Sequence, residues 1–519
     1  MNIILDRDRA IPLARQIQSH FERLIRERRL APGVKLPATR ELARDLGVNR
    51  ATVALAYEEL VAAGLARAHV GQGTFVAGAV EELPARGGPD ANGARPAHAP
   101  VDWSALLSRS ARIVSADEAR HAPETNGGGS GAGVVSFAGG MPDSALFPTD
   151  EFRRVLNGVV RDEGAELLQY YPAGGYPPLR RYLAGQLLRY GIEARPDEIL
   201  IVNGAQQGFD LIARTFIDPG DFVAIEQPTY PRAMQVLRSF GADLIVVPWD
   251  AEGPRADVFE RLVARHRPKL FYCQPTGHNP TGLTMSPARA RRLLATAGEA
   301  QVPIVEDGFD GHLYYGPRPP TPLRAVDRDG LVIYVGTFSK ALFPGLRLGW
   351  VVAPTPVLER LEAAKQLADL HTSALIQAAV HRFFARGLFD RAVTRATAEY
   401  ARRRAALLAS LARRMPEGVT WTEPAGGFTL LVTLPAGVDV RDVLEEGGAR
   451  GVAFTPGDVF MADSGAAGAG GRTRTLRLAF SSVAASRIDE GVRRLGEAIR
   501  TVQRRGRRAP VERVSVPLV

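Results

Sequence analysis

Lys340 stands in the segment GTFSKALFPGLRLGW (336–350), directly after the apolar run LVIYV. A lysine just past a strand end can form an imine with an aldehyde cofactor. The apolar neighbours of Lys340 lower the pKa of its amine and favour the neutral, nucleophilic form. Thr337 lies three residues before it and Arg347 seven residues after it, and both side chains suit a phosphate group.

The chain contains only four lysines, which limits the choice of an imine-forming amine. Lys35 lies in a separate N-terminal module. Lys269 and Lys365 have charged neighbours, and we expect both on helix surfaces. Lys340 is therefore the best candidate.

Polar residues also follow several other apolar runs. Asp307 comes after VPIV, where a carboxylate can hold a pyridine nitrogen protonated and so make the ring an electron sink. Asn279, in QPTGHNPTG, can hydrogen-bond a phenolic oxygen, and Tyr230, in EQPTYP, can stack on a ring. Arg477, in TLRLAFSS, can bind a substrate carboxylate through two hydrogen bonds.

The stretch IVNGAQQGFDLIA (201–213) has the pattern of a strand, a glycine turn and a helix. Gly204, Ala205 and Gln206 would present backbone N–H groups and a helix N-terminus to a phosphate. Each motif taken singly has an ordinary structural explanation as a turn or a buried pair. Together, at successive strand ends where open α/β sheets bind ligands, they indicate one cofactor site. We predict no metal site.

Residues 1–78 show a different pattern, in which short amphipathic helices precede a glycine-rich hairpin. Apolar spacing predicts a helix over 12–29, a second from a Thr39 cap to Gly47, and a third from an Asn49 cap to about Ala63. The stretch GLARAHVGQGTFVA (64–77) then predicts two short strands, a wing. Such an arrangement places a recognition helix in the major groove of DNA.

Chain length, composition and the pattern of apolar runs predict the domain organisation. The chain has 519 residues, a formal net charge of +9 and one cysteine, Cys273, so it is too long for one core and forms no internal disulfide. Residues 79–133 have the Gly, Ala and Pro content of a flexible linker. Residues 134–503 alternate apolar runs with helix-length segments, which predicts an α/β domain with a mostly parallel sheet, and 504–519 form a basic tail.

The N-terminal region also indicates the location of the protein. The sequence MNIILDRDRA has charges where a secretory signal needs an apolar run, and no apolar stretch approaches the roughly 20 residues of a membrane span. We expect a cytoplasmic protein with no membrane partner.

The segment LPATRELARDLGVNRATVALAYEELVAAGLARAHVGQGTFV (36–76) resembles the GntR family of bacterial regulators. The resemblance implies a winged helix-turn-helix that binds a double-stranded DNA operator. It implies DNA contacts at five residues, which are Arg40, Asn49, Arg50, Thr52 and Gly71. Asn49 can instead serve only as a helix cap, and Thr52 only in packing.

The large domain resembles fold-type I pyridoxal-phosphate enzymes, the aspartate aminotransferase superfamily. The motifs that carry this resemblance are SFAGGMPDSALFP (136–148), QYYPAGGYPPLRRYLA (169–184) and LRLAFSS (476–482). It implies an α/β fold with a small C-terminal α+β subdomain and pyridoxal 5'-phosphate held on Lys340 as an internal aldimine.

The same resemblance implies a role for each site residue. Asp307 would pair with the pyridine nitrogen, Asn279 with the phenolic oxygen, and Arg477 with the substrate α-carboxylate. Tyr170 would reach the phosphate of a neighbouring subunit, which implies a homodimer, and Gly140 would line the substrate side. Tyr230 would stack on the ring, and the phosphate would be held by Gly204, Ala205, Gln206, Thr337 and Arg347.

The sequence departs from related regulators at Phe309. They often have a tyrosine at this place, two residues after the pyridine-binding aspartate, and its hydroxyl meets the phenolic oxygen. Loss of that donor would make the phenolate and the imine more basic, which counts against efficient transamination. Tyr314 or Tyr315 would be alternative donors.

A GntR domain joined by a long linker to an aminotransferase-like domain resembles MocR-type regulators. The leading hypothesis is a transcription factor whose large domain senses pyridoxal phosphate, or an amine or amino acid that reacts with it. The resulting closure of that domain would shift the populations of DNA-competent arrangements. A second hypothesis is a working aminotransferase for an α-amino acid, and a third is a regulator whose large domain dimerises without a cofactor.

Overall fold

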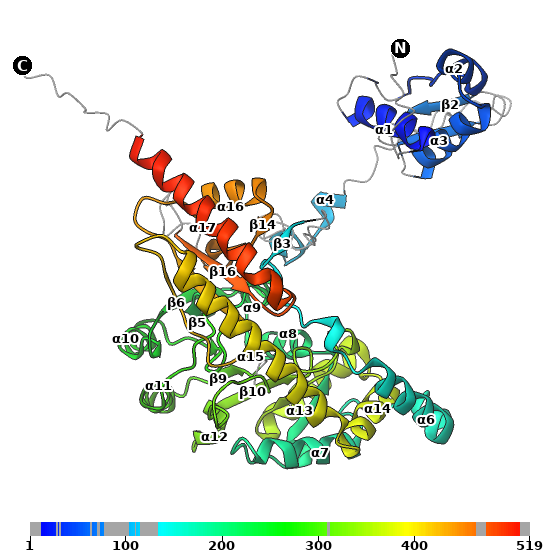
Figure 1. Ribbon diagram of the computed structural model, residues 1–519. Helices are drawn as coiled ribbons and strands as arrows, with labels where there is room; N and C mark the ends of the chain where they lie inside the picture. The colour runs from blue at the N-terminus through cyan, green and yellow to red at the C-terminus, as the bar shows by residue number, and fades with distance from the viewer. Residues whose placement is uncertain are drawn as a thin grey trace, which may run out of the picture. The chain divides into compact units, whose positions relative to one another are not determined.

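The computed structural model describes residues 12–26, 30, 33–62, 65–69, 73–76, 103–108, 110–114, 133–308, 312–462 and 474–508 (Figure 1). The chain divides into two compact units, Met1–Val101 and Asp102–Val519. None of the helices in these described ranges is long and apolar enough to cross a membrane.

Three helices and a two-stranded sheet build the first unit. The helices are α1 (Leu13–Arg26), α2 (Thr39–Leu46) and α3 (Arg50–Ala62), and the strands β1 (Ala66–His69) and β2 (Gly73–Val76) pair antiparallel as the predicted wing. Side chains at helical spacing fill the core between them, including Ile17, Phe21, Val53 and Leu60.

The helix ends in this unit follow local chemistry. Gly47 ends α2 in the left-handed conformation, at a φ of 61°, which confirms the predicted C-cap. Asn49 caps α3, because its side-chain oxygen accepts a hydrogen bond of 2.9 Å from the Ala51 N–H. The prediction for Thr39 is wrong: it is the first residue of α2, and the cap position is Ala38, whose side chain makes no capping bond.

An eight-stranded sheet organises the second unit. Its order is β4-β11-β10-β9-β8-β5-β6-β7. Strands β4, β10, β9, β8, β5 and β6 run in one direction, and β11 and β7 run against them, so the sheet is mostly parallel as predicted. The strands are β4 (Ile199–Val202), β5 (Phe222–Gln227), β6 (Asp243–Asp250), β7 (Gly253–Pro254), β8 (Phe271–Cys273), β9 (Ile304–Asp307), β10 (Val332–Thr337) and β11 (Gly349–Val352).

Helices cover both faces of this sheet, which explains why its strands are apolar on both sides. One face packs against α8 (Ala205–Phe216), α9 (Pro231–Ser239) and α13 (Thr355–Asp369). The other face packs against α6 (Thr149–Leu167), α7 (Pro177–Leu188), α10 (Ala256–His266), α11 (Pro287–Ala300), α12 (Leu323–Val326) and α14 (Ala374–Ala385). The edge formed by the carboxyl ends of the parallel strands is left for the site.

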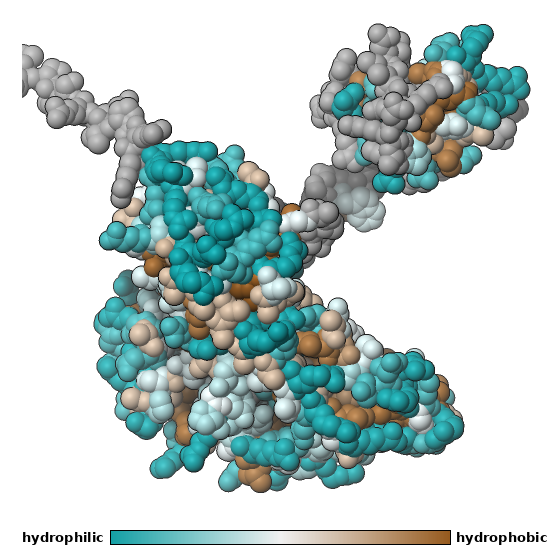
Figure 2. All heavy atoms as spheres, viewed as in Figure 1, coloured by the Kyte–Doolittle hydropathy of each residue, from teal (hydrophilic) through white to brown (hydrophobic). Residues whose placement is uncertain are grey.

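A smaller α+β subdomain follows the long helix α15 (Leu388–Arg414). Its antiparallel sheet has the order β12-β13-β16-β15. The amphipathic helix α17 buries Ile488, Val492, Leu495 and Ile499 in the core of this subdomain, and hydrophilic side chains cover its outer face (Figure 2). The remaining bounds are β12 (Thr420–Trp421), β13 (Thr429–Thr433), α16 (Val440–Ala449), β14 (Val452–Ala453), β15 (Thr455–Pro456), β16 (Thr475–Ala479) and α17 (Ala485–Arg508).

The chain enters the second unit beside this subdomain. Strand β3 (Val135–Ser136) pairs in parallel with β14, and the Gly133 carbonyl accepts hydrogen bonds from Arg487 and Arg494 of α17. Before this point the described residues form α4 (Trp103–Leu106) and a helical stretch at 110–114, within the predicted linker. Residues 138–148, which follow β3, continue directly into the site.

Candidate functional site

The predicted site residues of the large domain gather at the carboxyl edge of the sheet. Asp307 is the last residue of β9, and Lys340 lies just past the end of β10. Gly204 follows β4 and precedes α8. Because these strands are parallel and close in the sheet, residues from distant parts of the sequence meet at one edge.

Asp307 is almost fully buried, with 1% of its surface exposed. One of its carboxylate oxygens, Oδ2, accepts hydrogen bonds of 2.7 Å from the Tyr272 hydroxyl and from the Gln274 side-chain amide. Burial and the Asp307 charge raise the pKa of Tyr272 well above its usual value, so Tyr272 stays a neutral donor. These two donors fix the orientation of the carboxylate.

Gln274 also connects Asp307 to Asn279. Its side-chain oxygen accepts a hydrogen bond of 3.1 Å from the Asn279 N–H, and its own backbone N–H donates to Glu226 over 2.8 Å. Tyr272 and Gln274 were not singled out from the sequence. The available signal was the alternation of side chains along β8, next to β9, which points Tyr272 to the same face as Asp307; Gln274 directly follows the last residue of β8.

Arg477 is a buried cation whose hydrogen-bond partners are neutral. Its guanidinium donates to the Asn279 side-chain oxygen over 3.1 Å, to the Ala138 carbonyl over 2.8 Å, to the Gly139 carbonyl, and to the Thr455 hydroxyl over 3.2 Å. Within the described residues its buried Nε has no hydrogen-bond partner and no carboxylate pairs with it. Burial lowers the pKa of Arg477 to about 10, so it is still charged at neutral pH.

Lys340 lies close to the same segment of chain. Its Nζ donates a hydrogen bond of 2.9 Å to the Gly140 carbonyl and lies 5.7 Å from the centre of the Phe428 ring. A Cβ atom at Gly140 would lie 3.5 Å from both terminal nitrogens of Arg477. Lys340, Gly140 and Arg477 are therefore neighbours in one site.

The turn between β4 and α8 has the shape of an anion cradle. Gly204 has a φ of +78°, and a Cβ there would lie 2.8 Å from an Arg347 terminal nitrogen. Arg347 donates to the Asn203 carbonyl over 3.3 Å, and α8 starts at Ala205 with its free N–H groups. Gln206 is the second residue of that helix.

Two hydroxyls lie beside this cradle at the end of β10. Thr337 is buried, and its hydroxyl lies 2.9 Å from the hydroxyl of Ser339. Sequence reasoning missed Ser339, although it directly precedes Lys340. Tyr230 precedes α9 and is partly buried, and burial followed by the nearby Asp307 charge raises its pKa.

Tyr170 does not join the site of its own chain. It is 81% exposed, and its ring lies 6.2 Å from that of His371. Phe309, where the sequence departs from related regulators, lies outside the described residues.

Lys365 corrects an expectation from the sequence. It was expected on a helix surface, but its side chain is completely buried. It lies in α13 and forms hydrogen bonds of 2.8 Å to both carboxylate oxygens of Asp369. Charged neighbours in sequence did not reveal which helix face is covered.

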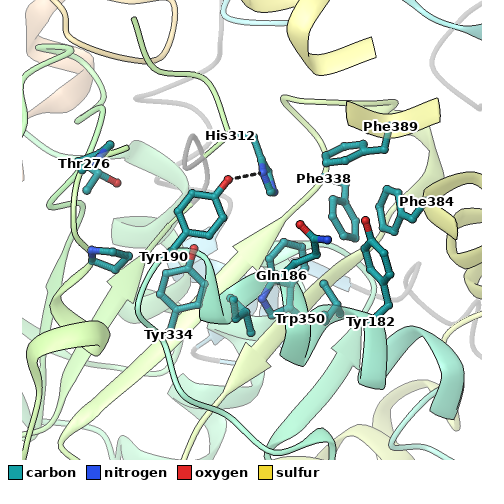
Figure 3. Close-up of a pocket in the computed structure, with 14 residues that line it drawn as sticks. Tyr182, Gln186, Tyr190, Thr276, His312, Tyr334, Phe338, Trp350, Phe384 and Phe389 are labelled. Atoms are coloured by element: carbon teal, nitrogen blue, oxygen red, sulfur yellow. Dashed lines mark hydrogen bonds between the residues drawn. The ribbon is translucent and has the colours of Figure 1, made fainter. Parts of the chain in front are cut away.

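A second pocket, lined mainly by aromatic side chains, lies next to β10 (Figure 3). In it the Tyr190 hydroxyl is 3.1 Å from His312 Nδ1, and the His312 ring contacts Phe338, Trp350 and Phe389. Burial lowers the pKa of His312 to about 4, so it is neutral at physiological pH. Two of its lining residues, Tyr334 on β10 and Phe338 just after it, belong to the stretch of chain that leads to Lys340.

The N-terminal unit presents most of its predicted DNA-contacting residues to solvent. Arg40, Asn49 and Arg50 are exposed, and Thr52 is half-buried. Asn49 and Arg50 stand at the start of α3, where free N–H groups favour phosphate oxygens. Gly71 lies outside the described residues.

Comparison with known families identifies both parts of the chain. Residues 140–495 match the family model for aminotransferase class I and II, and residues 13–76 match the model for bacterial regulatory proteins of the gntR family. The first match covers more than half of the chain.

Individual relatives fall into two groups. The chain is 38% identical to aromatic-amino-acid aminotransferase 1 of Thermococcus litoralis, over 71% of this chain and 88% of that protein. It is 30% identical to the probable rhizopine catabolism regulatory protein MocR of Rhizobium meliloti, over 88% of each. Among solved structures it is similar to LysN, the α-aminoadipate aminotransferase of Thermus thermophilus in complex with N-(5'-phosphopyridoxyl)-L-leucine. That structure has a TM-score of 0.70 and 35% identity, and the match covers 78% of this chain and all of that chain.

Pyridoxal phosphate is the expected cofactor of this family, and the described residues fit it. Gly204 has a positive φ, and a Cβ there would lie 2.8 Å from a terminal nitrogen of Arg347, so Arg347 faces the cradle. Asp307 offers a buried, firmly held carboxylate, and Lys340 offers an amine at the adjacent strand end. The phosphate would lie near Arg347, the protonated pyridine nitrogen near Asp307, and the aldehyde near the amine of Lys340.

Proposed function

The chain belongs to the aminotransferase class I and II family and carries a gntR-family regulatory domain, as MocR-type regulators do, and on this premise we propose that it senses an amine or amino acid. The sensor is the site around Lys340 in the large domain. The reader is the N-terminal unit, which binds an operator in double-stranded DNA.

The cofactor would be held by residues at the strand ends. When bound, pyridoxal phosphate supplies an electrophilic aldehyde and an electron-accepting ring. Lys340 would hold the aldehyde carbon, Asp307 the pyridine nitrogen, and Asn279 the phenolic oxygen. Tyr230 would stack on the ring, and the phosphate would lie against the phosphate cradle, formed by Gly204, Ala205, Gln206, Thr337, Ser339 and Arg347.

Arg477 supports a carboxylate-bearing effector. A buried cation whose described partners are all neutral is costly, and a carboxylate would compensate the charge through two hydrogen bonds. A Cβ at Gly140 would lie 3.5 Å from the Arg477 terminal nitrogens, and Lys340 donates to the Gly140 carbonyl, which supports an effector that carries both a carboxylate and an amine. An α-amino acid has both groups.

The observation that supports sensing most directly is that one short segment holds both reactive side chains. Residues 138–140 accept hydrogen bonds from Arg477 at Ala138 and Gly139, and from Lys340 at Gly140. A carboxylate that takes Arg477 and a cofactor that takes Lys340 have to replace these carbonyl contacts. Effector arrival would therefore release residues 138–140.

This segment continues without interruption toward the DNA-binding unit. Ser136 is the last residue of β3, and Gly133 is fixed by Arg487 and Arg494. A shift in residues 138–140 would act on this anchor within a few residues. The change in DNA binding would follow from the different populations of anchored and released states.

We further propose that the large domain forms a homodimer with shared sites. Tyr170 is highly exposed, as are Leu168 and Leu367, at 69% and 92%. The proposal is supported by the resemblance to a superfamily in which the tyrosine at this place reaches a neighbouring subunit, a role that needs an exposed side chain. Sedimentation of the full chain should give the mass of two copies, and Tyr170→Ala should weaken cofactor binding in the dimer.

Transamination is the second candidate function. Its support is the aminotransferase relative at 38% identity and the retention of Lys340, Asp307 and Arg477. A panel of amino donors and keto acids separates the two functions. Rapid turnover on one defined pair would favour an enzyme, whereas saturable binding without turnover would favour a sensor.

Absorbance of the full chain with added pyridoxal phosphate tests the proposal. The wild-type protein and Lys269→Ala should develop the visible band of a lysine imine, and Lys340→Ala should not. Titration with amino acids should then change that band saturably. A wild-type protein that stays colourless with excess cofactor, and traps none on borohydride reduction, would refute the proposal.

A further inference from the structure

Lys365 is a buried ammonium group that the proposed cofactor site does not use. It lies in α13, one turn before the end of the helix, and none of its side chain is exposed. A buried charge is costly unless it is paired and its hydrogen bonds are satisfied. The hydrogen bonds of Lys365 therefore show which neighbouring residues it holds in place.

Each N–H of the ammonium group has a partner available. Lys365 donates to both carboxylate oxygens of Asp369 at 2.8 Å, and to the side-chain oxygen of Gln207 at 3.2 Å. Asp369 is the last residue of α13, one helical turn after Lys365. The pair is therefore rigid and carries no net charge.

The same Asp369 carboxylate holds two residues of the sheet edge. Its Oδ2 accepts hydrogen bonds from the Asn203 side chain at 2.5 Å and from the Gln207 side chain at 2.7 Å. The side-chain oxygen of Gln207, which also accepts from Lys365, accepts a hydrogen bond of 2.8 Å from the Asn203 backbone N–H. Lys365, Asp369, Asn203 and Gln207 thus form one closed network, which we call the α13 network.

The α13 network encloses the turn that would face the phosphate. Asn203 and Gln207 flank the stretch 204–206 on its two sides. From the other direction, Arg347 donates to the Asn203 carbonyl and would meet any Cβ at Gly204. The turn is held between Arg347 and the ion pair of buried Lys365 with partly exposed Asp369, more than 150 residues away in sequence.

We propose that Lys365 and Asp369 are positioning residues for the cofactor phosphate. They hold Asn203 and Gln207 so that the N–H groups of Ala205 and Gln206 point at the same place as Arg347. The inference rests on the proposed cofactor site, and it concerns only the phosphate end of that site. The amine of Lys340 and the carboxylate of Asp307 do not take part in the α13 network.

A comparison of two aldehydes tests this role. Pyridoxal has the same ring and aldehyde as pyridoxal phosphate but lacks the phosphate, so the ratio of their dissociation constants reports the phosphate contacts alone. Both constants are measured from the visible imine band of the full chain. The variants are Lys365→Met and Asp369→Asn, and the control is Lys269→Met, which breaks a more exposed lysine–aspartate pair with Asp221.

The wild-type preference for the phosphorylated form should fall about tenfold in both α13 variants, the size expected when a buried charged partner is lost. It should stay unchanged in Lys269→Met, and the affinity for pyridoxal should stay close to wild type in all variants. Equal weakening of both aldehydes, or an unchanged ratio, would overturn the inference.

Two further measurements keep the test decisive. Gln207→Met removes the shared partner and leaves the ion pair intact, so it should show the same fall in preference if the charge variants do not fold. Stabilisation by inorganic phosphate, measured as a shift in melting temperature, needs no imine and should be lost in the α13 variants. A wild-type chain that forms no imine with either aldehyde would refute the proposed function, whereas unchanged phosphate stabilisation in the variants would refute the positioning role.

Discussion

Arg477 combines burial, positive charge and neutral partners. The residue is only 9% exposed, and its guanidinium donates to Asn279, Thr455 and two backbone carbonyls. In water such a group would be solvated, and inside the protein it is stabilised when a carboxylate arrives. In the proposed function, effector binding therefore depends on Arg477.

Arg477→Gln should weaken the binding of an amino-acid effector about 100-fold, because a charged hydrogen-bond pair is lost. Burial lowers the pKa of Arg477 to about 10, so the charge is complete at neutral pH and is lost as the pH rises through that value. The ratio of variant to wild-type dissociation constants should therefore shrink above pH 10. Spectral titration at several pH values measures it, and the titration of the effector's own amine cancels in the ratio.

An amine without a carboxylate is the control for Arg477. It should bind wild type and Arg477→Gln with equal affinity. A 100-fold loss for this amine as well would mean that the substitution damages the site instead of removing a carboxylate partner.

Among single residues, the sequence predicted those that would contact the cofactor or effector better than those that hold them in position. Lys340, Gly140, Arg477 and Asn279 lie together, because motifs at strand ends are brought together by a parallel sheet. The supporting residues Tyr272, Gln274, Ser339 and Lys365 were missed or misjudged. Their roles depend on contacts between strands and helices far apart in sequence, which spacing along the chain does not encode.

At the scale of elements, the packing of α7 against the sheet depends on a neutral histidine. His312 and Tyr190 are hydrogen-bonded in the aromatic pocket, where protonation of the imidazole is unfavourable (Figure 3). Burial lowers the pKa of His312 to about 4 from a usual value near 6.5. Because the unfolded chain takes up this proton first, stability is lost as the pH falls from 6.5 toward 4.

The double variant His312→Phe with Tyr190→Phe removes this pH dependence without leaving a buried hydroxyl unpaired. Between pH 7 and pH 5, wild type should lose about 2 kcal/mol more unfolding free energy than the double variant. Urea unfolding at both pH values measures the difference. An identical loss in the two proteins would show that His312 is not the responsible group.

At the start of α3, the capping role of Asn49 can be tested separately from the predicted DNA contacts of Asn49 and Arg50. Asn49→Asp keeps the acceptor for the Ala51 N–H, so the melting temperature should not change, but the added negative charge should weaken DNA binding. Arg50→Ala should also weaken it and should reduce the slope of affinity against salt by about 1.

The control for α3 is Arg23→Ala, which removes an exposed arginine from α1. It should leave operator affinity unchanged. Unchanged affinity in Arg50→Ala would instead contradict the assignment of α3 as the recognition helix. Fluorescence anisotropy with the DNA upstream of the gene provides both measurements.

The elements themselves followed from local patterns. The three N-terminal helices, the wing and the mostly parallel sheet appear as the apolar spacing predicts. Helix boundaries were less well predicted, as at Thr39, because a capping residue type does not fix which backbone position it occupies. Strand order across the sheet was not predicted, since it depends on contacts between segments.

At the scale of the molecule, a small-molecule site and a DNA-binding unit share one chain. Within the large unit, residues 138–140, whose carbonyls accept hydrogen bonds from Lys340 and Arg477, lead back along the chain through β3 to Gly133. Composition alone predicted two functional parts and a linker. The proposed coupling uses backbone carbonyls, which every residue has, so the sequence could not indicate it.

The central claim is that chemistry at Lys340 controls DNA binding. The most direct test is the operator affinity of the full, cofactor-loaded chain during titration with an amino acid that changes its visible band. In wild type the affinity should change with the same midpoint as the band, and in Lys340→Ala the amino acid should have no effect. A wild-type chain whose band responds fully while its DNA affinity stays constant would contradict the account.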